Sequence, residues 1–336
     1  MEESKLYMDS GWVNWEFIYN LPQHMIFVTG GRGIGKTYGL LKYLFEKGIK
    51  FIFVRRTQVE ADIQMNMDVS DISPVLEDLH INAMIDKIPK TPVSLVIDKD
   101  TDERLALIGS LRTFGKIRGM NFRDYDCIVF DEFIPKPEEP KFKLEGFALK
   151  QAYESVNRNR ELEGRDAVKM ICLSNSLNMQ NDTFMEFDLI GVAEDLAMGK
   201  KELYTDGEVA VIISKYSPIS EKKSGTVLYK NKDDDFYKMA IKNEFILNDF
   251  SYVCKQNLKE YQCKAKIGDL YVYKHKSKTI YYITKTKGET KNIVKATASG
   301  IELIKRKFWR LWIHYLDGNI RFDSYKSISL FEKYFE

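Results

Sequence analysis

The eight residues GGRGIGKT, positions 30–37, constrain the fold of this chain more than any other stretch. They satisfy the G-x-x-x-x-G-K-[ST] pattern, in which a tight turn points its backbone N–H groups at phosphate oxygens. The turn lies between the apolar run MIFVT and an amphipathic segment from about Lys36 to Lys47 that ends at Gly48. This order predicts a buried strand, a phosphate-binding loop and a helix.

The loop predicts a bound nucleoside triphosphate, ATP, together with Mg²⁺. We expect Lys36 to reach the β- and γ-phosphates and the Thr37 hydroxyl to bind the Mg²⁺ ion. No G-x-G-x-x-G pattern can be drawn through this region, which argues against a dinucleotide-binding fold. The expected nucleotide-binding set is Gly30, Gly31, Arg32, Gly33, Ile34, Gly35, Lys36 and Thr37.

A second apolar run, YDCIVFDEF at residues 125–133, ends in two acids. A P-loop needs a carboxylate at the end of a neighbouring buried strand to hold the metal, and we assign this role to Asp131. Glu132 follows directly and is placed to polarise a water for attack on the γ-phosphate. Kinases attack with their substrate instead of water, so Glu132 favours hydrolysis, with a small-molecule kinase as the alternative.

Two further stretches fit an ATPase. In LSNS, residues 173–176, Ser174 and Asn175 follow a strand and could sense the γ-phosphate, although ordinary capping of the strand end is the alternative. In VNRNRE, residues 156–161, either Arg158 or Arg160 could act as an arginine finger on a neighbour's nucleotide. A solvated helix arginine is the alternative there.

The distribution of charge separates the chain into two parts. Residues 1–216 contain 27 Lys and Arg against 35 Asp and Glu, whereas residues 217–336 contain 24 against 14. The basic part is the better candidate for binding a polyanion, with a merely solvated surface as the alternative. No window approaches the roughly 18 apolar residues of a membrane span, and the four cysteines lack metal-site spacing. We therefore expect a soluble, intracellular protein with reduced cysteines.

Strand and helix signals alternate through residue 216, which predicts an α/β domain with a mainly parallel sheet flanked by helices over residues 1–216. Residues 217–247 are polar and charged without a sustained apolar period, and we interpret them as a linker or a small bridging element. Residues 248–336 contain a hairpin pattern and a helical pattern, which predict a second, smaller α/β domain.

The stretches GGRGIGKT, FIFVRR, IVFDEF, NRNRE and ICLSN, in this order, resemble the DNA-packaging ATPases of phi-29-like podoviruses. The resemblance covers nearly the whole nucleotide-binding part and returns near the C-terminus in GNIRFDSY. It implies an ASCE-type P-loop ATPase that assembles as a ring, a homopentamer, at the portal vertex of an empty capsid in the host cytoplasm. Such a ring drives double-stranded DNA into the capsid. Some relatives place a structural packaging RNA between portal and ATPase, and the residues leave that requirement open here.

The resemblance also implies roles for individual residues. Asp131 would be the metal acid, Glu132 the water-activating base, and Arg158 the finger acting across the subunit interface. Asn175 would lie in the stretch that couples hydrolysis to movement. The family has a lysine two residues after the second arginine of VRR, whereas this chain has Gln58, which puts a charge-based role there in doubt.

For the C-terminal domain, the resemblance implies an RNase H-like fold that has lost nuclease activity. The hairpin reads YVYKHKSK, with lysines and His275 where a first-strand acid is expected, and Asp317 and Asp323 lack evident partners. A complete terminase that cuts DNA and a non-enzymatic, nucleotide-gated DNA-binding module are the alternatives. The residues expected to contact DNA phosphates are Lys274, Lys276, Lys278, Lys305, Arg306 and Lys307.

Overall fold

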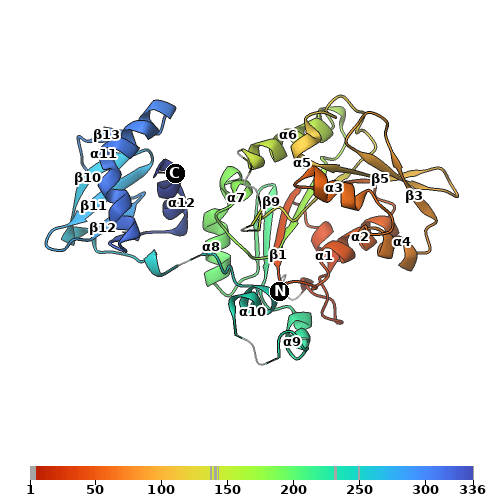
Figure 1. The fold of residues 1–336 in the computed structure, drawn as a ribbon, viewed down its shortest axis with the longest axis horizontal. Coiled ribbons are helices and arrows are strands. Elements are labelled where there is room, and N and C mark those ends of the chain that lie inside the picture. Colours follow the sequence, from red (N-terminus) through yellow and green to blue (C-terminus); the bar gives the residue numbers. More distant parts are fainter. Residues whose placement is uncertain are drawn as a thin grey trace. The chain divides into compact units, whose positions relative to one another are not determined.

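The computed structural model describes residues 5–136, 138–139, 142, 144–230, 233–248 and 250–335. The chain divides into two compact units, residues 1–247 and 248–336, each with its own sheet (Figure 1). Among the residues so described, no helix combines the length and the apolar character that crossing a membrane requires.

The first unit is mixed α/β, and its described residues form a nine-stranded sheet in the order β3-β4-β5-β2-β6-β7-β1-β9-β8. The six central strands, β5, β2, β6, β7, β1 and β9, run parallel to one another. Antiparallel strands extend the sheet at both edges, β4 and β3 beside β5 and β8 beside β9. Helices cover both faces of the central strands, which explains their continuous apolar runs. The strands are β1 Met25–Gly30, β2 Phe51–Arg55, β3 Ala83–Lys87, β4 Ser94–Asp98, β5 Arg104–Ser110, β6 Cys127–Asp131, β7 Lys169–Ser174, β8 Leu203–Asp206 and β9 Val209–Ser214.

The helices of the first unit are mostly short. Helix α2 buries Leu40, Leu41, Leu44 and Phe45, so its apolar side packs into the core while its first residue stays at the P-loop. The helices are α1 Trp15–Tyr19, α2 Thr37–Glu46, α3 Gln58–Gln64, α4 Ser73–Asp78, α5 Leu111–Phe114, α6 Glu145–Asn157, α7 Asp182–Glu186, α8 Ile190–Met198, α9 Pro218–Ser224 and α10 Asp235–Tyr237, with a 3₁₀ turn at Glu161–Glu163 and a π-helical turn at Lys238–Lys242.

The segment 217–247 belongs to the first unit, which corrects its interpretation as a linker. It contains α9, α10 and the π-helical turn, and it buries Tyr229, Met239 and Phe245. The Lys223 ammonium donates a hydrogen bond of 2.7 Å to the Arg32 carbonyl oxygen in the P-loop. The segment's polar composition gives no helical or strand period because polar residues such as Ser217, Ser220 and Asn243 are buried together with the apolar ones.

The second unit is built on a mixed sheet, five-stranded in its described part, in the order β13-β10-β11-β12-β14. Strands β10, β11 and β12 form an antiparallel meander, while β13 and β14 add in parallel at the two edges. The elements are β10 Tyr261–Ile267, β11 Leu270–His275, β12 Tyr281–Thr284, β13 Ile293–Val294, α11 Ala298–Leu316, β14 Ile320–Phe322 and α12 Tyr325–Phe335. The expected hairpin and helix are present, and the RNase H-like assignment stays a prediction.

Candidate nucleotide-binding site

The P-loop connects the end of β1 to the start of α2, and glycines are required at two of its positions. Gly35 has φ of +89°, a conformation that side chains rarely adopt. At Gly31, an added Cβ would come within 2.3 Å of Asn243 Oδ1 and 2.4 Å of the Ala240 carbonyl oxygen. The loop is therefore shaped both by its own sequence and by the segment 217–247 packed against it.

The Lys36 side chain is buried within the loop. Its ammonium donates hydrogen bonds to the carbonyl oxygens of Gly30 at 2.9 Å and Gly31 at 2.6 Å, and to Asn175 Oδ1 at 3.3 Å. Burial lowers the pKa of Lys36 to about 8, although the charge of Asp131 opposes the shift. The side chain thus has the position and the charge to bind phosphate oxygens, and it is already linked to Asn175 at the end of β7.

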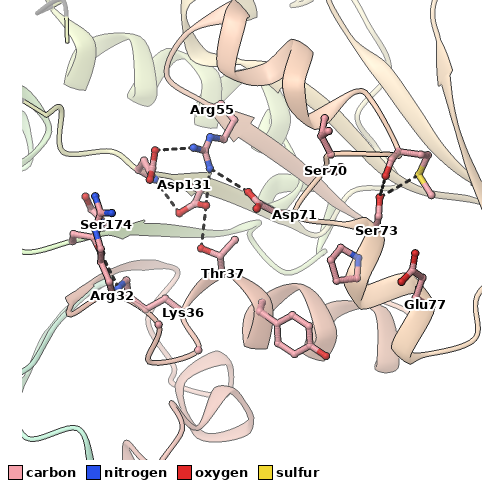
Figure 2. Close-up of a pocket in the computed structure, with 18 of the residues that line it drawn as sticks. Arg32, Lys36, Thr37, Arg55, Ser70, Asp71, Ser73, Glu77, Asp131 and Ser174 are labelled. Carbon is pink, nitrogen blue, oxygen red and sulfur yellow. Dashed lines mark hydrogen bonds and ion pairs between the residues drawn. The ribbon is translucent and has the colours of Figure 1, made fainter. Parts of the chain in front are cut away.

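Thr37 and Asp131 meet as the P-loop pattern predicts. The Thr37 hydroxyl donates a 3.0 Å hydrogen bond to Asp131 Oδ2 at the end of β6 (Figure 2). Burial raises the pKa of Asp131, while the neighbouring Arg55 guanidinium opposes the shift. A hydroxyl and a carboxylate oxygen are the kind of ligands that Mg²⁺ prefers, so this pair fits the metal.

The backbone of Glu132, directly after the end of β6, has an unusual conformation. Its φ of +55° lies in the left-handed region, and its N–H donates a 2.9 Å hydrogen bond to Asp131 Oδ1. Such strain costs on the order of 1 kcal/mol and is characteristic of functional sites. The Glu132 side chain, 31% exposed, lines the cleft described below.

Arg55 was not among the predicted site residues, yet it joins the two acids. Its Nη1 donates to Asp131 Oδ2 at 2.9 Å and its Nη2 to Glu132 Oε2 at 2.7 Å, as Figure 2 shows in part. Its buried Nε has no hydrogen-bond partner among the described residues. The sequence signal that could have identified Arg55 is the FIFVRR run, an apolar strand that ends in two arginines. Because β2 pairs with β6, this basic strand end lies beside Asp131.

These residues line a cleft of about 1150 Å³, large enough for a nucleotide. One wall is the P-loop with the ends of β2, β6 and β7. The opposite wall is formed by the residues between α3 and α4 and by α4 itself, and it carries the exposed acids Asp68, Asp71 and Glu77. No motif marked this wall in the sequence, because its residues are ordinary surface types.

The other predicted residues divide between the cleft and the surface. Ser174 and Asn175 line the cleft, but the Ser174 hydroxyl accepts a 3.3 Å hydrogen bond from the Ile134 N–H and has a structural role. Arg160 is buried, donating to the Tyr125 carbonyl oxygen at 2.6 Å and pairing with Asp126. Arg158 is exposed and lies outside the residues that line the cleft.

The predicted DNA-contacting residues of the second unit lie on two elements. Lys274 is at the end of β11, with Lys276 and Lys278 in the following turn, and all three are exposed. Of the second group, all on α11, Arg306 and Lys307 are exposed and Lys305 is half-buried.

Asp317 and Asp323, the two acids singled out in the sequence of this unit, each follow the end of an element. Asp317 directly follows the last residue of α11. Asp323 accepts hydrogen bonds from the Thr284 hydroxyl and the Lys285 N–H, so it joins β12 to the end of β14.

Comparison with known proteins gives a family match over almost the whole chain. The model of the family described as podovirus DNA encapsidation protein (Gp16) matches residues 8–331. The DNA packaging proteins of Bacillus phages PZA and phi29 are each 28% identical over 196 residues, covering 56% of this chain and 52% of the relative. The match thus spans about half the length of these relatives.

Two solved structures share the fold across both units' residues. The Phi-28 gp11 DNA packaging motor has a TM-score of 0.63 at 16% identity, covering 98% of each chain. The bacteriophage Phi-29 genome packaging motor assembly has a TM-score of 0.65 at 20% identity, covering 96% of this chain and 99% of that chain. At these identities the likeness concerns the fold alone.

Proposed function

The chain belongs to the family of podovirus DNA encapsidation proteins, and from this premise we propose that it is an ATP-hydrolysing motor that moves double-stranded DNA into an empty capsid. The observation that carries the proposal is the contact of Thr37 with Asp131, directly followed by the strained Glu132. A metal-binding pair next to a carboxylate that can orient water is what hydrolysis of a nucleoside triphosphate needs.

Bound Mg²⁺ and ATP would supply a polarised γ-phosphoryl group as the electrophile. Lys36 would move its three hydrogen bonds from the loop and Asn175 to phosphate oxygens, since an anion is a better acceptor than a carbonyl oxygen. Glu132 would accept a proton from the attacking water through its carboxylate. Because Asn175 bonds to Lys36, a change at Lys36 would be passed to the end of β7.

Movement of the DNA would depend on Arg158 and on the basic residues of the second unit. Arg158, which is exposed and does not line the cleft of its own chain, would act on the nucleotide of a neighbouring copy in a ring. We propose that this ring is a pentamer at the capsid portal in the host cytoplasm. The exposed lysines and arginines of the second unit would bind DNA phosphates without reading bases, which suits a motor that handles any sequence. We also propose that the second unit has no nuclease activity. A packaging RNA between the portal and this protein is a further part of the proposal.

The test compares phosphate release by the wild type and by Glu132→Gln, with and without double-stranded DNA, while a gel follows DNA integrity. We expect DNA-stimulated release from the wild type and a loss of at least about 100-fold in the variant, because an amide cannot take the proton. The DNA should stay intact. Phosphorylation of an added small molecule instead of phosphate release would favour a kinase, and cleaved DNA would favour a complete terminase.

Native mass spectrometry of the assembled motor tests the subunit number. Five copies on the portal support the proposed pentamer, and any other number overturns that part alone.

A further inference from the structure

The P-loop carries an exposed arginine that contacts an aromatic ring from outside the loop. The Arg32 guanidinium lies 5.7 Å from the centre of the Phe236 ring, and both side chains are exposed, Phe236 to 39%. The Tyr229 ring is buried and lies nearly parallel to the Phe236 ring, at an interplanar angle of 5° and a centroid distance of 6.1 Å. We call Arg32 and Phe236, with Tyr229 beside them, the Phe236 platform. It presents an aromatic and cationic surface to solvent.

The platform is joined to the P-loop through Lys223. The Lys223 ammonium donates its 2.7 Å hydrogen bond to the Arg32 carbonyl oxygen and lies 5.3 Å from the centre of the Tyr229 ring. A Cβ atom placed on Gly33 would come within 3.0 Å of the same ammonium, so Lys223 contacts two successive loop residues. Both Arg32 and Gly33 line the cleft, and the platform therefore begins at the edge of the nucleotide site.

The order of the strands indicates which end of a nucleotide the platform would meet. The groups beside the P-loop that would face the metal and the terminal phosphates, Asp131 and Asn175, lie at the ends of β6 and β7. The segment 217–247 instead follows β9, which pairs with β1 on the side away from β7. Figure 2 shows Arg32 on one side of Thr37 and Glu77 on the other. With its terminal phosphate near Asp131, a nucleotide bound along the loop would extend its base toward Arg32.

We infer that the base of the bound nucleotide stacks on the Phe236 platform. The inference rests on the proposed function, because it takes a nucleotide as the ligand of the cleft. Aromatic rings and guanidinium planes both stack on nucleobases, and such stacking tolerates different bases because every base has an aromatic face. The platform would thus distinguish a nucleotide from an inorganic polyphosphate. The segment 217–247 would supply the base end of the site, while the P-loop binds the phosphates.

Isothermal titration calorimetry of the full chain with Mg²⁺ tests the stacking contact with two ligands, a non-hydrolysable ATP analogue and inorganic tripolyphosphate. We expect Phe236→Ala to weaken binding of the analogue about 5- to 100-fold, because stacking of the base on the ring is lost. The affinity of this variant for tripolyphosphate should stay within about twofold of the wild type, because the P-loop binds phosphate without the platform. Phe236→Tyr keeps the ring and should bind both ligands as the wild type does.

Tyr38→Ala is the matched control at a second exposed ring. Tyr38 is 40% exposed, lines the cleft directly after Thr37, and donates a hydrogen bond to Asp78 at the end of α4. Because this ring lies on the α4 side, its removal should leave the ratio of the two affinities unchanged. A selective loss of the ATP analogue in Tyr38→Ala but not in Phe236→Ala would overturn the inference, since the base would then lie on the α4 side.

Equal weakening of both ligands in Phe236→Ala would also overturn the inference, because the ring would then only support the P-loop. Unchanged affinity for both ligands would overturn it as well. Phosphate release separates these results from the proposed function. A wild type that releases no phosphate with DNA present, although Phe236→Ala selectively loses the ATP analogue, would count against the proposed function alone. DNA-stimulated release by a Phe236→Ala protein with unchanged affinity for the analogue would count against the base contact alone.

Discussion

The two units place charged side chains in opposite environments. At the ends of the parallel strands in the first unit, Lys36, Arg55 and Asp131 are all more than nine-tenths buried, and each makes specific hydrogen bonds. In the second unit, Lys274 and Lys276 project into solvent from the end and tip of a hairpin. Chemistry on a phosphoryl group needs fixed geometry, whereas attraction to a polyanion needs only mobile charge within reach.

We expect the largest effect on folding stability when a buried cation of the first unit is removed. Arg55→Met leaves the two carboxylates beside it without their partner, which should destabilise the nucleotide-free first unit by about 3–5 kcal/mol. Hydrogen exchange of the β2 and β6 amides measures this unit by itself. Lys136→Met is the control: its side chain is 31% exposed, with the ammonium 3.8 Å from Glu132 and 3.3 Å from Glu139, and should contribute less than about 1 kcal/mol. Equal effects of the two substitutions would show that burial does not distinguish these cations.

The next effect follows from the titration of Lys36. Its pKa in the empty site is about 8, and bound phosphate favours the charged form, so nucleotide binding above pH 8 must take up a proton. Affinity for ATP should therefore fall as pH rises above 8, by up to about tenfold per pH unit. Calorimetry in buffers of different ionisation enthalpy measures the proton uptake. Lys36→Met should bind weakly without this pH dependence, and a wild type with pH-independent affinity between 8 and 9.5 would contradict the expectation.

The smallest effect concerns the exposed lysines. Replacing Lys274, Lys276 and Lys278 together by Ala should leave folding stability within about 0.5 kcal/mol for each substitution. It should also reduce the slope of log K for DNA against log salt concentration by up to about 2.7, if each lysine neutralises one phosphate. DNA binding by fluorescence anisotropy at several salt concentrations is the measurement. The control replaces Lys200 and Lys201, exposed residues of the first unit; an equal change per lysine there would show that net charge alone controls binding.

The sequence was informative where local chemistry requires particular residue types. The P-loop glycines, Lys36 and Thr37 lie next to each other in the chain, and an apolar run ending in acids identified Asp131 without any tertiary information. The parallel α/β sheet followed from the same pattern of buried strands and intervening helices. These features are local, so a single sequence contains them.

What the sequence could not supply depends on contacts between distant residues. Arg55 reaches Asp131 only because β2 and β6 are neighbours in the sheet, an order that strand patterns do not specify. The local pattern around Arg158 and Arg160 also does not contain the difference in their burial, because Arg160 is buried only through its pairing with the distant Asp126. The segment 217–247 appeared to be a linker because its buried apolar residues, among them Tyr229 and Met239, are spread along the segment without a regular period, and part of its packing is against P-loop backbone.

The packing of residues 240–243 against Gly31 determines where this protein can be divided. A fragment ending at Tyr216, where the composition changes, would uncover one side of the nucleotide loop and the buried side chains of Tyr229, Met239 and Phe245. The shortest fragment that keeps the first unit folded should therefore end near Leu247. Limited proteolysis of the full chain should yield a resistant core that retains the segment 217–247. A fusion of the first unit to a different second domain should place the junction after this segment.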